Sequence, residues 1–178
     1  MAVDHVKSTP ITNADASPPV ANLSGAGAAG PLHNVQGYAT AVASSSADAT
    51  YQLVRLPSNA KVVRIMFESE AQTAGKFDIG CYYATDGRVH GKATALLAAD
   101  AIDQDFFATV IDCASAVART DITNESGTYT LDKREQPLWQ ALGLTSDPRG
   151  FIDIVATVKT TAVTTGTGKF GVSVDFIP

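Results

Sequence analysis

A strict two-residue alternation near the end of the chain is the feature that most constrains its fold. Within residues 169–177, four large apolar residues alternate with small or polar ones: Phe170, Val172, Val174 and Phe176. Successive side chains of a β-strand point to opposite faces, so this pattern predicts a strand with one buried and one solvated face. It is the clearest half-buried strand in the sequence.

Five further runs are rich in β-branched and aromatic residues and are predicted to be strands: residues 34–43, 50–56, 61–69, 76–83 and 151–160. Two of these runs place apolar residues on one face, namely Phe77, Ile79, Cys81 and Tyr83 in the first and Ile152, Ile154, Ala156 and Val158 in the second. Another strand is predicted at residues 136–142, around Trp139. About eight short strands with regular turn signals between them are typical of a sandwich or barrel. We therefore expect an all-β fold, an antiparallel β-sandwich or jelly roll.

The segment at residues 93–108 has a different pattern. It is rich in Ala and Leu and then becomes acidic and aromatic, which predicts one or two short helical turns inserted between strands. Asp103 and Asp105 would then cap or flank a helix N-terminus, and this role is favoured over Ca²⁺ binding because no bidentate Glu follows at loop spacing. Residues 114–119 are a further candidate for a brief turn.

Residues 1–34 differ in composition from the rest of the chain. They hold four of the eight prolines and the small-residue run SGAGAAG, and they show no period of 2 or 3.6. Such a composition buries too little apolar surface to offset its ordering entropy. Isolated apolar residues nevertheless recur at intervals: Ile11, Val20, Leu23 and Leu32. Two interpretations stay open, a disordered leader and an extended N-terminal arm that inserts these side chains into pockets on a neighbour. On the second, residues 1–34 are the arm and residues 35–178 a jelly-roll-like β domain.

Charge and composition exclude several classes of partner. The chain has 13 Lys and Arg against 18 Asp and Glu, a formal net charge of −5. This argues against nucleic acid and against a polybasic membrane surface, which both need clustered cations. No apolar run approaches the roughly 18–20 residues that span a bilayer, and the first residues do not resemble a secretory signal. Cys81 and Cys113 are too few for a disulfide scaffold and are expected to be buried, in a chain made in a reducing cytoplasm.

No catalytic constellation is visible in the sequence. The three histidines, His5, His33 and His90, lack the spacing of metal ligands. Nucleophile-elbow, phosphate-loop and dinucleotide motifs are absent as well. We therefore expect no enzyme, no cofactor and no metal ligand.

Several short motifs follow one another through the middle of the chain. In order they are LPSNAKV at 56–62, DIGCY at 78–82, DG at 86–87, DQDFF at 103–107 and VIDCA at 110–114. This series of strand and turn residues resembles head decoration proteins of tailed bacteriophages, also described as cement or capsid-stabilising proteins. The resemblance covers roughly residues 50–115 and, more loosely, the closing strands. The arm has no counterpart in it.

The resemblance implies a jelly-roll domain on the outer surface of an icosahedral head, made in the host cytoplasm. Such proteins commonly form trimers that tie neighbouring major capsid proteins together, so the expected partners are the major capsid protein and further copies of this chain. The arm residues Ile11, Val20, Leu23 and Leu32 are the predicted contacts with the capsid or another subunit. Uncharged strand faces at Val62, Met66 and Tyr82 are the predicted trimer surface.

One alternative is a carbohydrate- or receptor-binding β-sandwich from a phage tail or fibre. It needs exposed aromatic side chains near carboxylates and amides, and the candidates are Trp139, Tyr51, Tyr82, Tyr83 and Tyr129. A core or interface position is favoured for most of them, because the aromatic content of 7% is ordinary. A jelly-roll enzyme of the cupin kind is a second alternative, which the scattered histidines disfavour.

Overall fold

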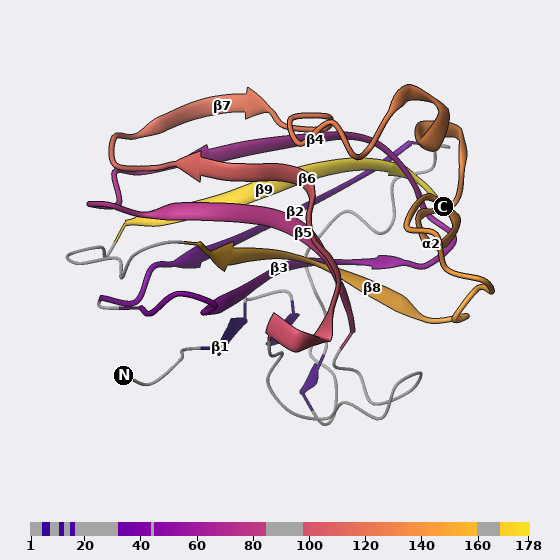
Figure 1. Cartoon of the computed structure of the whole chain (residues 1–178), viewed down its shortest axis with the longest axis horizontal. Helices are drawn as coiled ribbons and strands as arrows, with labels where there is room; N and C mark the ends of the chain where they lie inside the picture. Colours follow the sequence, from indigo (N-terminus) through magenta and orange to yellow (C-terminus); the bar gives the residue numbers. More distant parts are fainter. Residues whose placement is uncertain are drawn as a thin grey trace.

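Nine strands form two sheets in the computed structural model, which describes residues 5–7, 11–12, 15–16, 32–43, 45–84, 98–159 and 168–178. The strands in these ranges are β1 His5–Lys7, β2 His33–Thr40, β3 Thr50–Pro57, β4 Lys61–Ser69, β5 Lys76–Tyr83, β6 Ala101–Asp112, β7 Val117–Asp121, β8 Phe151–Val158 and β9 Lys169–Ile177. One sheet has the order β1-β3-β8-β5-β6 and the other β2-β9-β4-β7. Figure 1 shows them as two layers of a β-sandwich.

The strand pairs are nested along the chain. β5 pairs with β6, β4 with β7, β3 with β8 and β2 with β9, and every one of these pairs is antiparallel. The chain from β2 to β9 is therefore one long folded hairpin, and alternate pairs of it lie in opposite sheets. This is the jelly-roll topology. It confirms the predicted all-β sandwich, and the small strand β1 is added in parallel beside β3.

Aromatic side chains fill the space between the two sheets. Phe77 of β5 stacks on Phe170 of β9 with ring centroids 4.5 Å apart, and Tyr51 of β3 meets Phe170 edge-on at 5.1 Å. The predicted apolar faces of residues 76–83, 151–160 and 169–177 line this core as expected, except for Tyr83; Phe176 is partly buried and packs against the core. Each such side chain contributes about 1.5–3 kcal/mol when it is fully buried.

Two sequence predictions for the middle of the chain are only partly right. Within the described part of residues 93–108, one short helical turn is present, the 3-10 helix η1 at Ala98–Asp100. Residues 101–112 instead form the long strand β6, so the expectation that Asp103 and Asp105 cap a helix is wrong. The second half of the expected turn at 114–119 belongs to β7, Val117–Asp121, which pairs with β4, and a bend remains at 114–115. In both places cross-strand pairing overrides the local composition.

The predicted strand at 136–142 is wrong as well. A 3-10 helix, η2 at Leu131–Glu135, and a short α-helix, α2 at Leu138–Ala141, occupy the connection between β7 and β8. Leu138 and Ala141 are both buried, and their spacing of three residues suits one face of a helix. Pro137 sits at the N-cap, where its missing N–H costs nothing. This connection and the C-terminus lie at the same end of the molecule (Figure 1).

Candidate functional site

The four predicted contact residues of the N-terminal segment have different positions. Ile11 is buried within its own chain, with 1% of its surface exposed. Leu32, just before β2, is 52% exposed. Val20 and Leu23 lie outside the part of the chain that the structure describes. Ile11 is thus a contact within the subunit in this conformation, whereas Leu32 is available to a neighbour.

Ion pairs hold the start of the N-terminal segment against the β1-β3-β8-β5-β6 sheet. The Arg55 guanidinium donates to Asp15 at 2.7 Å and, through two nitrogens, to both carboxylate oxygens of Asp153 at 2.7 and 3.0 Å. Lys7 of β1 donates to the second oxygen of Asp15 at 2.7 Å, and Gln52 donates to Asp153 at 2.8 Å. Two cations and two carboxylates therefore form a neutral network, which we call the Arg55 network.

Burial sets the electrostatics of the Arg55 network. Burial acts to raise the pKa of Asp15, but the hydrogen bonds and charges of Lys7 and Arg55 together outweigh it, and the pKa is lowered. Asp153 has no exposed surface, and burial raises its pKa although Arg55 and Gln52 oppose this. The Asp153 carboxylate thus depends on Arg55 to remain charged in the interior.

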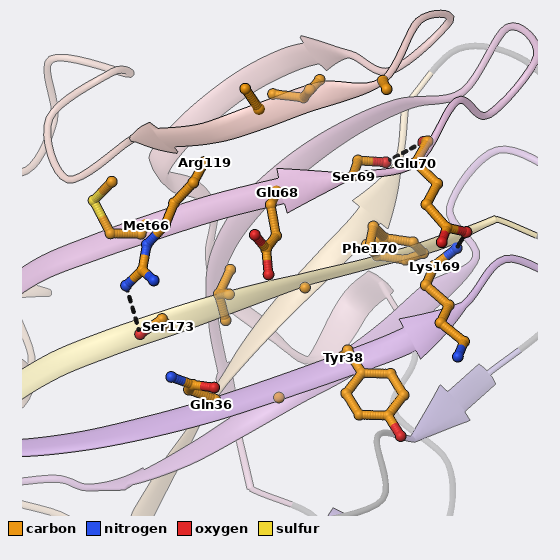
Figure 2. Close-up of a pocket in the computed structure, with 16 residues that line it drawn as sticks. Gln36, Tyr38, Met66, Glu68, Ser69, Glu70, Arg119, Lys169, Phe170 and Ser173 are labelled. Atoms are coloured by element: carbon orange, nitrogen blue, oxygen red, sulfur yellow. Dashed lines mark hydrogen bonds between the residues drawn. The ribbon is translucent and has the colours of Figure 1, made fainter.

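A groove of about 520 Å³ crosses the outer face of the β2-β9-β4-β7 sheet. Figure 2 shows Tyr38 on one side of it, Glu68 pointing toward the inner strand β9, and Arg119 on the far side. Tyr38 on β2 and Glu68 on β4 are the two cross-strand neighbours of Gly171 on β9. Because Gly171 has no side chain, the space between these two neighbours is open.

The polar side chains of this groove are only partly engaged with one another. Arg119 reaches Ser173 at 3.5 Å, and the Lys169 ammonium lies 5.8 Å from the centre of the Tyr38 ring. Glu68 and Gln36 have no side-chain hydrogen bond or ion pair with any residue that the structure describes. The groove therefore offers a carboxylate and an amide to a ligand.

Sequence reasoning missed Tyr38, which is 55% exposed. The five aromatic residues named instead include Tyr51, Tyr82 and Tyr129, which are fully buried, as favoured above for most of them. The other two, Trp139 and Tyr83, are partly buried. The alternation in residues 34–43 contained the missing signal, because Tyr38 shares the polar face of that run with Asn34, Gln36 and Thr40.

Two of the three residues of the predicted trimer surface are buried within the subunit. Val62 and Tyr82 are both fully buried within the subunit. Val62 lies in the core between the sheets, and the Tyr82 hydroxyl is within 2.7 Å of the Thr157 hydroxyl on the outer side of the other sheet. Met66 alone of the three reaches the surface, where it lines the groove.

Other chemistry is sparse in the ranges that the structure describes. No group of three His, Cys, Asp or Glu side chains in these ranges is placed to bind a metal ion. Cys81 and Cys113 are buried and unpaired, and burial raises the pKa of both thiols, that of Cys113 to about 11. The prediction that both cysteines are buried is confirmed. Among the helices in these ranges, none has the length and apolarity to cross a bilayer.

Comparison with known proteins shows similarity at the level of fold. Neither a protein-family model nor a curated protein matches the sequence significantly. A chain in the solved capsid of Ralstonia phage GP4 matches with a TM-score of 0.53 at 14% sequence identity, over 89% of this chain and 88% of that chain. A chain in the capsid asymmetric unit of cyanophage Pam1 matches with a TM-score of 0.51 at 14% identity, over 91% of this chain and 95% of that chain. The protein thus shares its jelly-roll fold, over nearly its full length, with chains from two phage capsids.

Proposed function

We propose that this protein is a structural component of a bacteriophage virion. The single observation that carries the proposal is the fold similarity to chains of two phage capsids, which spans nearly the whole of each chain. The motifs at residues 56–62 and 78–82 support the same class independently, since they resemble decoration proteins. A fold alone does not fix a function, so the motif resemblance is added as support for the role that the fold similarity suggests.

The specific role we propose is decoration and cementing of the head. The protein would bind the outer surface of the capsid as a trimer and bridge neighbouring major capsid proteins. Three attachment points on one trimer act at high effective concentration, which turns weak single contacts into lasting occupancy. Synthesis in the host cytoplasm is in keeping with two unpaired cysteines.

The N-terminal segment is the proposed attachment device. Val20, Leu23 and the exposed Leu32 are the proposed contacts with the capsid or a second subunit. Ile11 and Asp15 fix the start of the segment to its own subunit. A force on the rest of the segment would therefore act on the Arg55 network and on β3. Apolar contacts of this kind contribute about 25 cal/mol per Å² before ordering costs are subtracted.

We also propose that the protein is not an enzyme. Its two fully buried carboxylates, Asp153 and Asp78, are paired with Arg55 and Lys159, and burial raises the pKa of both thiols. The buried titratable groups thus serve packing and ion pairing.

A binding experiment with empty heads tests the proposed role. Purified heads that lack this protein are mixed with increasing amounts of the full chain, and bound copies are counted by gel densitometry. Saturable binding that raises the temperature of head disruption supports cementing. Absence of binding at micromolar concentration would contradict it. Light scattering of the free protein tests the trimer separately.

A further inference from the structure

The groove on the outer face of the β2-β9-β4-β7 sheet has a shape that the sequence enforces. A Cβ atom at Gly171 would lie 2.4 Å from the carbonyl oxygen of Gly37 and 2.9 Å from the Cα and Cβ atoms of Tyr38. No side chain fits there unless β2 moves. A glycine in the middle of a strand often marks a place where another backbone approaches closely, and here that backbone is β2.

The size of the groove suits a small molecule. Its volume of about 520 Å³ falls within the range of roughly 300–1,000 Å³ that is usual for ligand sites. It is open along one side, because it is a furrow across a sheet and not an enclosed cavity (Figure 2). An elongated ligand lying across the strands would fit this form better than a compact one.

The charges that border the groove balance one another. Glu68 on β4 and Glu70, the residue directly after β4, line the groove together with Arg119 on β7 and Lys169 on β9. A groove with two anions and two cations favours a ligand without net charge that has both hydrogen-bond donors and acceptors. Hydroxyl groups have this property, since each one donates and accepts.

Tyr38 adds a flat apolar surface to these polar groups. Its ring is 55% exposed, on a face of β2 that otherwise carries the polar residues Asn34, Gln36 and Thr40. A pyranose ring has the matching character, with an apolar face of C–H groups and an edge of hydroxyls. An exposed aromatic ring can pack on the C–H face of a sugar, and neighbouring amide, carboxylate and guanidinium groups can bond its hydroxyls.

We propose that this groove is a carbohydrate-binding site for a short neutral oligosaccharide. Tyr38 stacks on one sugar ring, Glu68 and Gln36 bond hydroxyl groups over the space above Gly171, and Arg119 bonds the next sugar along the groove. This site is separate from the N-terminal segment and does not depend on the proposed cementing role. A head protein with such a site would hold the particle weakly to glycans on a cell surface.

The test is binding of the full-length protein to an array of short neutral oligosaccharides, followed by calorimetric titration of the strongest binder. We expect saturable binding with a dissociation constant in the micromolar to millimolar range. Tyr38→Ala should weaken it by about 10-fold or more, as for the loss of about 1.4 kcal/mol, and Glu68→Ala should weaken it by a similar factor. Tyr38→Phe should bind within about 3-fold of the wild type, because the ring is retained.

Leu131→Ala is the matched control. Leu131 is 74% exposed and lies outside the groove, so the change should leave affinity unchanged. Circular dichroism shows whether each variant is folded, and an unfolded Tyr38→Ala would be replaced by Tyr38→Ser or Glu68→Ala for the comparison. Absence of binding to every oligosaccharide would overturn the proposal. Sugar binding that survives both Tyr38→Ala and Glu68→Ala would overturn the proposal too. So would a protein that binds no sugar but whose Tyr38→Ala variant occupies phage heads less fully than the wild type.

Discussion

At the scale of single residues, Arg55 determines whether a buried charge is tolerated. It holds Asp153, which has no exposed surface, through a two-nitrogen contact, and it extends the same guanidinium to Asp15. Paired geometry of this kind is among the strongest in proteins. Removing one partner of such a pair leaves an uncompensated charge in the interior, which costs more than the pair contributes.

Arg55→Ala should therefore lower the free energy of unfolding by about 3–5 kcal/mol, measured by urea denaturation at neutral pH. Arg64→Ala is the matched control. Arg64 also bonds an aspartate, Asp175 at 2.8 Å, but its side chain is 52% exposed. The control should lose no more than about 1 kcal/mol. Equal losses in the two variants would contradict the importance of burial.

The lowered pKa of Asp15 predicts how the stability of the fold depends on pH. The pKa is lowered below its ordinary value of 3.8 in the folded protein, so the folded state binds the Asp15 proton less tightly than the unfolded state. The resulting stabilisation is fully present above about pH 4 and is lost as the pH falls through the lowered pKa.

Asp15→Asn should accordingly lower the free energy of unfolding by about 1–2 kcal/mol at pH 7 and by less at pH 3. The measurement is urea denaturation of both proteins at the two pH values. A difference between them that stays constant with pH would show that the Asp15 charge does not fix the N-terminal segment.

At the scale of elements, a strand could be predicted where its own residues showed alternation or a high β-branched content. The bounds of β4, β5 and β9 are those expected from the alternation or β-branched content of each run. β6 was not predicted, because its Ala-rich approach and the acidic residues Asp103 and Asp105 favour a helix locally, and only pairing with β5 makes it a strand.

The candidate sites were harder to predict than the strands. Arg55 and Asp153 are 98 residues apart in sequence, and Tyr38, Gly171 and Glu68 come from three strands. Nothing local marks such a set, since register across the sheet brings it together. The alternation in residues 34–43 places Tyr38 on a polar strand face, but which residues lie across from it followed only from the fold.

The stacked pair at the centre of the sandwich gives a prediction about how the two sheets adhere. Phe77→Ala removes the ring that stacks on Phe170 and leaves a cavity between β5 and β9. The expected loss is about 3–5 kcal/mol in the free energy of unfolding. Phe151→Ala, at a position that is 36% exposed, should cost much less. Comparable losses would mean that the core tolerates the cavity by collapsing.

The N-terminal segment gives a prediction that involves both stability and attachment. Deletion of residues 1–16 removes β1, the buried Ile11 and the Asp15 contact. We expect the free energy of unfolding to fall by about 1–3 kcal/mol, since burial of one Ile contributes about 1.5–3 kcal/mol and part of this is offset by ordering entropy. Occupancy on heads should fall as well. Unchanged occupancy and unchanged stability together would contradict the proposed anchoring.

At the scale of the whole molecule, the nested pairing explains how one chain forms both layers without a second domain. Each sheet receives alternate pairs of one folded hairpin, so the N-terminal β2 and the C-terminal β9 are direct neighbours. A jelly roll of this kind has no built-in chemistry and is used by many kinds of protein. Its outer faces, its loops and the N-terminal segment are what distinguish one member from another.

A reconstruction of virions that contain this protein, with mass spectrometry of the same particles, tests the central claim most directly. The account predicts a stoichiometric component whose β-sandwich lies on the outer surface of the head and contacts at least two major capsid subunits. A protein that is absent from purified particles, or that lies elsewhere in them without touching neighbouring capsid subunits, would contradict it.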